Sequence, residues 1–95
     1  MAVILIHDTP GVDAAMAEGL KASGVLEELA KAPGFVSHIS GPTQTGYRVI
    51  EVWDSQASHQ QWYDTHVAPN VPPGIEPATP QYLELTLQVK AVELA

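Results

Sequence analysis

Four stretches of the chain predict β-strands: the first is a continuous β-rich run, and the third and fourth alternate between two faces. A dense turn signal follows the first stretch, and the loop 41–46 joins the second to the third as a hairpin. In the third stretch Tyr47, Val49, Glu51 and Trp53 share one face, opposite Arg48, Ile50 and Val52. The four predicted strands are residues 3–7, 35–40, 47–53 and 81–90.

Two further stretches carry apolar residues at helical spacing. The first begins at Asp13, a good N-cap residue, and Ser23-Gly24 interrupts it, which predicts a kink or two shorter helices. The second is capped by Asp54-Ser55 and runs to about Ala68. A proline-rich loop then reaches Pro80.

The resulting order β, α, β, β, α, β predicts one α+β domain over residues 1–95, of the ferredoxin-like kind. Its four-stranded antiparallel sheet has both helices on one face. The other face carries too much apolar surface to remain in water, so we expect a homodimer formed through the sheet.

The composition excludes several classes of function. Eleven Asp and Glu against four Lys and Arg give a formal net charge of −7, so nucleic acid and anionic membrane surfaces are not expected as partners. No cysteine is present, which excludes disulfides and thiolate chemistry and fits a reducing cytoplasm. The early apolar run, residues 2–6, is too short to span a bilayer, and no secretory signal is expected.

Two segments carry a resemblance to a known family: residues 33–42, PGFVSHISGP, and residues 46–55, GYRVIEVWDS. They resemble the dimeric α/β-barrel superfamily, and within it the antibiotic-biosynthesis-monooxygenase-like group. The resemblance implies a homodimer with a cavity between sheet and helices in each subunit. Monooxygenase members oxidise electron-rich phenols or anthrones without a cofactor, and Trp53 and His66 match the residue types of their pockets. An asparagine that many members carry on an early strand is missing, since Asn70 is the only one.

On the second helix, His59, Trp62, Tyr63 and His66 lie at i, i+3, i+4 and i+7 and form one stripe. The stripe either faces a substrate cavity or is the core-facing side of the helix with histidines at its edges. In the first case His66 and Trp62 point into the cavity and His59 lies nearer its mouth. The i, i+7 spacing of the histidines excludes a compact metal site, whereas His66 remains a possible haem ligand.

The strands supply further candidates. His38, in mid-strand, and His7, at the end of the first strand, are candidate general bases. The alternative for each is a structural histidine bonded to a loop carbonyl, which is favoured more for His7. Glu51 is expected to be at least partly buried, either hydrogen-bonded across the dimer interface or transferring protons with His7 or His38. Trp53 and Tyr47 are candidate substrate contacts, with packing as the alternative for both. Tyr82 is a strand tyrosine like Tyr47, and for it an apolar body with a hydroxyl in water is favoured.

We therefore expect a cofactor-independent, monooxygenase-like enzyme acting on an aromatic, polyketide-like or quinol substrate. Its candidate catalytic residues are His66, His38 and Glu51. A cyclase or isomerase would use the same base and pocket. The rival from another class is a non-catalytic dimer that binds a hydrophobic small molecule or haem.

Overall fold

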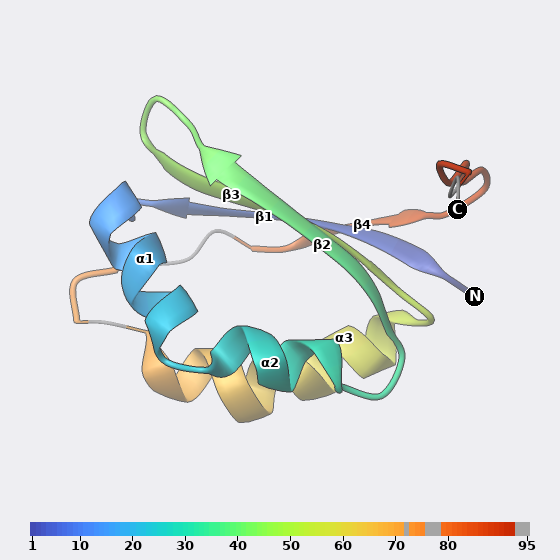
Figure 1. Ribbon diagram of the computed structural model, residues 1–95, viewed down its shortest axis with the longest axis horizontal. Coiled ribbons are helices and arrows are strands. Elements are labelled where there is room, and N and C mark those ends of the chain that lie inside the picture. Colours follow the sequence, from blue (N-terminus) through green and yellow to red (C-terminus); the bar gives the residue numbers. More distant parts are fainter. Residues whose placement is uncertain (72, 76–78, 93–95) are drawn as a thin grey trace.

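The computed structural model describes residues 1–71, 73–75 and 79–92. It is an antiparallel sheet with helices packed against one of its faces (Figure 1). The strands are β1 (Val3–Pro10), β2 (Phe35–Pro42), β3 (Gly46–Trp53) and β4 (Gln81–Glu84). The helices are α1 (Ala14–Ala22), α2 (Val25–Ala30) and α3 (Gln56–Trp62), which continues as a π-helical turn, η1 (Tyr63–Val67), and a 3₁₀ turn, η2 (Ala68–Asn70).

The strand order in the sheet is β2-β3-β1-β4, with every neighbouring pair antiparallel. Two crossovers through helices and one hairpin connect the strands in this order. The predicted ferredoxin-like α+β fold is confirmed.

The first three strands extend further than the sequence pattern predicts. Asp8, Thr9 and Pro10 pair with the start of β3, so β1 runs past the predicted turn. His7 therefore lies in the interior of β1 rather than at its end, and the prediction of a strand-end histidine is wrong. The loop between β2 and β3 shortens to residues 43–45. Gly46 is needed there because a side chain would collide with the Thr9 carbonyl.

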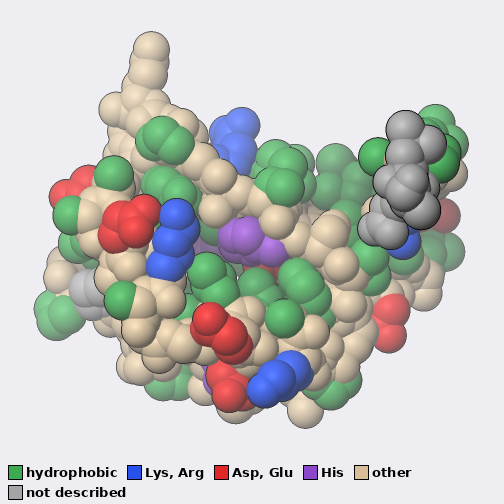
Figure 2. Space-filling model, in the orientation of Figure 1, with side chains coloured by type: hydrophobic (Ala, Val, Ile, Leu, Met, Phe, Trp, Pro, Cys, Tyr) green, Lys and Arg blue, Asp and Glu red, His purple; other side chains and the backbone are tan. Residues whose placement is uncertain are grey.

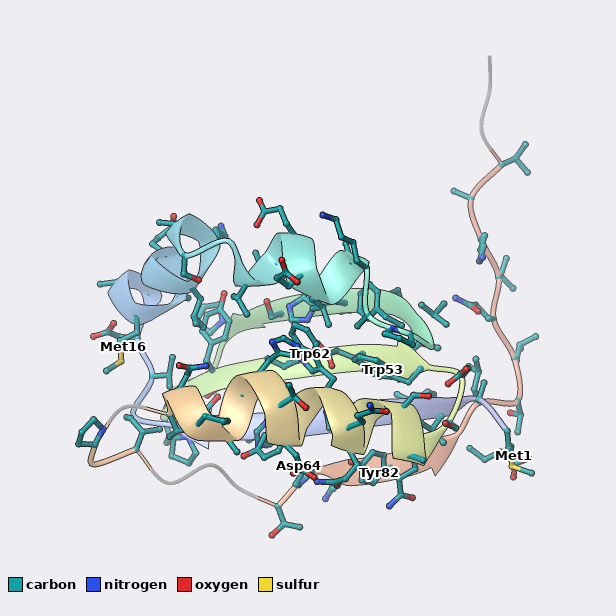
Figure 3. The ribbon with its side chains drawn as sticks, turned by 90° about the horizontal axis from the view of Figure 1, so that it is seen from below. Met1, Met16, Trp53, Trp62, Asp64 and Tyr82 are labelled. Carbon is teal, nitrogen blue, oxygen red and sulfur yellow. The ribbon has the colours of Figure 1, made fainter. Side chains whose placement is uncertain are left out.

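The fourth strand is shorter than predicted. It pairs with β1 only from Gln81 to Glu84, and one further bond joins the Leu85 amide to the Ala2 carbonyl at 2.9 Å. β1 begins at Val3, so within the described chain residues 86–92 have no neighbouring strand to pair with. This C-terminal arm, residues 86–92, leaves the body of the molecule with Leu87 and Val89 exposed (Figure 3).

Local signals place the helices as predicted. The Asp13 carboxylate accepts a hydrogen bond from the Met16 amide at 2.9 Å, and the Ser55 hydroxyl accepts one from the Ser58 amide at 3.1 Å. Gly24, at φ 85°, separates α1 from α2, which confirms the predicted break. The second predicted helix is confirmed in extent, although its last turns are π and 3₁₀. Of the predicted proline-rich loop, residues 72 and 76–78 lie outside the described part.

The buried core lies under one half of the sheet. Leu29 of α2, Trp53 of β3 and Trp62 of α3 form its cluster, and Phe35 packs against it. The pairing of β2 with β3 contains a bulge, because Phe35 faces Trp53 whereas Ser37 already faces the next residue, Val52. No helix in the described residues is long and apolar enough to cross a membrane.

Candidate functional site

A cavity of about 720 Å³ lies between the inner, helix-covered face of the sheet and the helices. Leucine and valine side chains form much of its wall. In Figure 2, histidine side chains are visible in the hollow between sheet and helices. Of the residues predicted from sequence, the structure brings eight to the cavity wall: His7, His38, Tyr47, Glu51, His59, Trp62, Tyr63 and His66.

Trp53 is the predicted substrate contact that does not reach the cavity. It has no exposed surface, and its ring packs edge-on against Phe35, with ring centroids 5.4 Å apart. Its indole Nε1 donates a hydrogen bond to Glu51 Oε1 at 2.9 Å. The geometry makes Trp53 a packing residue of the core cluster that also positions Glu51 through this hydrogen bond.

Glu51 is buried, as predicted, and it is the centre of the polar groups in the cavity. Its Oε2 lies 2.6 Å from His38 Nδ1, and His38 Nε2 lies 3.0 Å from the Ser40 hydroxyl oxygen. With the carboxylate as acceptor, the proton sits on Nδ1 and the lone pair on Nε2. Pairing of β2 with β3 places His38 directly beside Glu51. The contact between the Glu51 carboxylate and the His38 imidazole thus fixes the orientation of the ring and of its basic nitrogen, Nε2.

The structure favours one of the two interpretations of Glu51. Both of its oxygens are hydrogen-bonded within the chain, on the face that the helices cover. An interface formed through the other face of the sheet would not reach this carboxylate. The partner is His38, one of the two histidines considered for proton transfer.

His59 is more deeply buried than expected. Its exposed fraction is 3 %, so the prediction that it lies near the cavity mouth is wrong. The rings of Trp53 and Tyr82 cover it, with centroids 5.6 and 5.5 Å away. Burial lowers the pKa of His59 below 6.5, although the Glu51 charge opposes that shift. The lowered pKa keeps His59 neutral at pH 7.

Tyr82, for which the sequence favoured an apolar body with its hydroxyl in water, also belongs to the site. Its hydroxyl lies 2.7 Å from His59 Nδ1, and His59 Nε2 is 4.0 Å from Glu51 Oε1. Burial raises the pKa of the Tyr82 phenol, so it remains protonated. The register of the strands places Tyr82 on the same face as Glu51, because Leu5 pairs with Glu51 on one side and with Tyr82 on the other.

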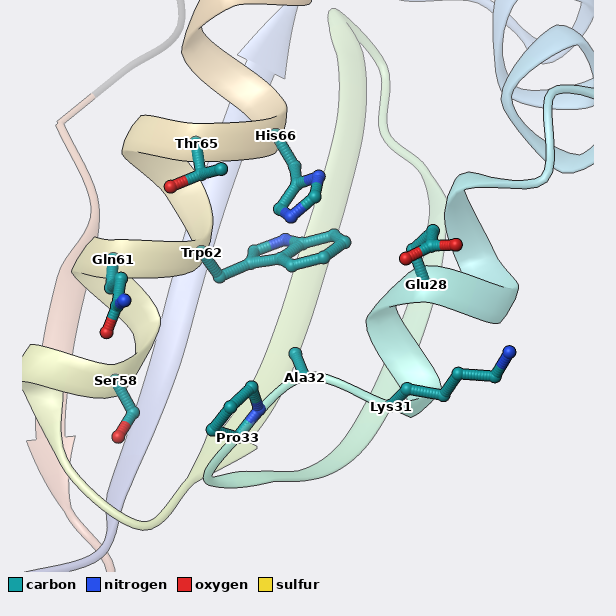
Figure 4. A pocket seen from close by; sticks show the side chains of 9 residues that line it. All are labelled: Glu28, Lys31, Ala32, Pro33, Ser58, Gln61, Trp62, Thr65 and His66. Carbon is teal, nitrogen blue, oxygen red and sulfur yellow. The ribbon is translucent and has the colours of Figure 1, made fainter.

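The helical wall of the cavity is formed by the predicted stripe. His66 stacks on Trp62 with ring centroids 4.2 Å apart and planes at 25°, and Tyr63 contacts His7 edge-on at 5.6 Å. These two side chains also line a smaller hollow of about 220 Å³ on the other side, between α2 and α3 (Figure 4). His66 and Trp62 therefore lie between the cavity and this outer hollow. The π-helical turn that carries His66 is a feature frequent at functional sites.

The outer face of the sheet, opposite the helices, has a different chemistry. Arg48 forms a two-pronged ion pair with Asp8, at 2.7 and 3.0 Å, and this pairing lowers the pKa of Asp8. The pair sits beside apolar residues and leaves Arg48 remote from the cavity. Among the described residues, no cluster of three or more His, Asp or Glu has an arrangement suited to a metal ion.

Comparison with solved structures supports the fold. SnoaB, a cofactor-independent oxygenase from Streptomyces nogalater, is 16 % identical, with a TM-score of 0.61 over 92 % of this chain and 95 % of its own. The heme-degrading protein of Mycobacterium tuberculosis is 22 % identical, with a TM-score of 0.58 over 95 % of this chain and 100 % of its own. A dimeric ferredoxin-like protein from Jannaschia sp. is 18 % identical, with a TM-score of 0.54 over 90 % and 100 %.

The chain thus has the dimeric ferredoxin-like fold that cofactor-independent oxygenases and heme-degrading proteins share, as the resemblance in its sequence implied. No known family profile matches the sequence, and no curated protein matches it.

Proposed function

We propose that this protein is a cofactor-independent, monooxygenase-like enzyme whose substrate is an electron-rich phenol, anthrone or quinol. The observation that carries the proposal is the His38–Glu51 contact of 2.6 Å at the wall of an otherwise largely apolar cavity. When the carboxylate accepts the Nδ1–H hydrogen bond, Nε2 keeps its lone pair and the imidazole is held in one orientation, so Nε2 can act as a base. An apolar cavity of about 720 Å³ accommodates a planar aromatic molecule.

The reaction needs a base more than any other group. His38 Nε2 accepts the proton of the substrate's hydroxyl or acidic C–H group, and the imidazolium that forms is stabilised by Glu51. The substrate anion reduces dioxygen. For an anthrone, one dioxygen converts the CH₂ group to C=O and releases one water, so no external reductant is consumed. SnoaB, which shares the fold, is a cofactor-independent oxygenase and supports this reaction class.

The test is oxygen uptake with 1,8-dihydroxyanthrone, with quinone formation followed by absorbance. His38→Gln is expected to lower kcat by about 10²–10⁴-fold, the usual contribution of a general base. Arg48→Lys, on the outer face of the sheet, is the control and should keep the wild-type rate. Turnover that His38→Gln leaves unchanged would exclude His38 as the base. Substrate loss without dioxygen would instead favour a cyclase or isomerase.

A second candidate function is haem binding, and the position of His66 favours it. His66 lies at the cavity wall, and its imidazole is a possible axial ligand. Lys21 supplies a cation among the described lining residues for a propionate group. The heme-degrading protein of Mycobacterium tuberculosis has the same fold. Titration with hemin should give a sharp Soret shift that His66→Ala abolishes, whereas an unchanged Soret band on adding wild-type protein would exclude this function.

We further propose that the protein acts as a homodimer joined through the outer face of the sheet. That face exposes Ile39 and Leu83 to 66 % and 51 %, beside Ile4, Ile6, Ile50 and Val52. Burying apolar surface of this kind against a partner is favourable, and a two-fold symmetric contact buries the same surface of both subunits at once. The ferredoxin-like relative from Jannaschia sp. is dimeric.

A further inference from the structure

Among the described cavity residues, Ser40 is hydrogen-bonded to His38 and has no part in the proposed oxygenase chemistry. Its hydroxyl oxygen lies 3.0 Å from His38 Nε2, and His38 Nδ1 lies 2.6 Å from Glu51 Oε2. The three side chains therefore form a continuous line of serine hydroxyl, imidazole and carboxylate. The order and both distances are those of a nucleophile, its general base and the group that orients the base.

We propose that Ser40, His38 and Glu51 are a catalytic triad for acyl transfer, acting on uncharged esters with an apolar acyl group. This activity goes beyond the proposed oxygenation, with which it shares His38 and Glu51 but not Ser40. Exposure increases along the line. The Glu51 side chain is 6 % exposed, that of His38 is 23 % exposed, and Ser40 is exposed at the cavity rim. The nucleophile is thus accessible and the orienting carboxylate is shielded from water.

The hydrogen bonds of the buried Glu51 carboxylate fix the tautomer of His38. Trp53 Nε1 donates to Glu51 Oε1 at 2.9 Å, and His38 Nδ1 lies against the other oxygen, so both carboxylate oxygens are held. A carboxylate held in this way keeps Nδ1 protonated and Nε2 free to accept the Ser40 proton. A serine hydroxyl is a weak nucleophile without such a base.

The developing oxyanion needs a hydrogen-bond donor, and we assign that role to the Tyr47 phenol. In the pairing of β2 with β3, Ser40 faces Val49, and Tyr47 follows two residues away on the same face. Diagonal neighbours of this kind are about 7–8 Å apart at their Cα atoms, a span that a tyrosine side chain covers. Tyr47 lines the same cavity as Ser40.

Each step balances. Ser40 Oγ forms a bond to the ester carbonyl carbon while His38 Nε2 takes its proton. The C–O bond to the leaving alcohol then breaks, and that alcohol receives the proton from His38. Water, the second substrate, is deprotonated by His38 and releases the carboxylic acid, which restores the Ser40 hydroxyl.

The experiment is covalent labelling with an alkyl fluorophosphonate, with no dioxygen or phenol present, so its result is independent of the oxygenase proposal. Peptide mass spectrometry should place one adduct on Ser40, in the tryptic peptide 32–48. This peptide also contains Ser37, which faces Val52 on the opposite side of the sheet, so fragment spectra distinguish the two. Release of p-nitrophenol from p-nitrophenyl butyrate should show a burst of about one equivalent per chain.

Four variants complete the test. Ser40→Ala should abolish labelling and the burst, whereas Ser37→Ala, the matched control on the same strand, should retain both. His38→Gln should slow labelling by 100-fold or more, and Tyr47→Phe should slow ester turnover at least tenfold. Absence of an adduct on Ser40, or equal labelling in Ser40→Ala or His38→Gln, would overturn the proposal. Ser40→Ala removes only one hydroxyl from an edge strand, so it keeps the test decisive even where His38→Gln does not fold.

Discussion

The two faces of the sheet depart from the usual arrangement of an antiparallel sheet, in which apolar side chains face the core and polar ones face water. The inner face carries His7, His38 and Glu51 in addition to its core residues Leu5 and Trp53, and the outer face carries many isoleucine, valine and leucine side chains beside the Arg48–Asp8 ion pair. Burying polar groups costs free energy unless they are hydrogen-bonded, which Glu51 and His38 are. This difference is the basis for our proposals that the inner face carries the reacting groups and that the outer face forms the dimer contact.

The largest effect is expected at the inner face, from Trp53→Ala. Truncation of a fully buried tryptophan should lower the free energy of unfolding by about 3–5 kcal/mol, measured by urea denaturation. Trp53→Phe is the matched variant, because it keeps an aromatic ring while it loses the bond to Glu51 and part of the buried ring volume. It should cost about 1–3 kcal/mol. If Trp53→Ala cost less than 1 kcal/mol, the inner face would not be the core that we describe.

Ile50→Lys addresses the outer face. Ile50 pairs with Ile6 on one side and Ile39 on the other, so it lies in the middle of the apolar surface. An unpaired lysine in a buried interface should weaken dimerisation by about 100-fold or more. Light scattering after size-exclusion chromatography should give twice the chain mass for wild type and Ile50→Val, and the chain mass for Ile50→Lys. A wild-type monomer at micromolar concentration would contradict the assigned role of this face.

The smallest effect concerns pH and His59. Its pKa is lowered in the folded protein and lies near 6.5 in the unfolded chain, so below pH 6.5 the unfolded state binds more protons. Stability therefore falls as pH decreases from 6.5 toward the lowered pKa and is constant above. The slope for one such group is at most about 1.4 kcal/mol per pH unit. His59→Gln should reduce this slope in urea titrations between pH 7 and 5, and an unchanged slope would show that burial does not perturb His59.

Sequence patterns predicted the element order, the helix caps and the face of β3 that bears Glu51, because these depend on local propensity and strict alternation. They did not predict the length of β4, which depends on where β1 begins. Nor did they predict the contact of His59 with Tyr82, since 23 positions of chain separate the two residues. Long-range contacts of this kind arise from strand register, which a single sequence specifies weakly.

The bulge in β2 determines on which side of the sheet His38 lies. Phe35 and His38 are an odd number of residues apart, so simple alternation would put them on opposite faces. The extra residue, Val36, shifts the count by one, and both side chains reach the inner face. From Ser37 onward, each side chain therefore lies on the face opposite to the one that strict alternation from Phe35 would give it. An insertion or deletion of one residue in this strand thus has consequences that depend on its place. Loss of Val36 leaves His38 facing Glu51, whereas a single insertion between Ser37 and His38 would turn the imidazole toward the outer face of the sheet and away from Glu51.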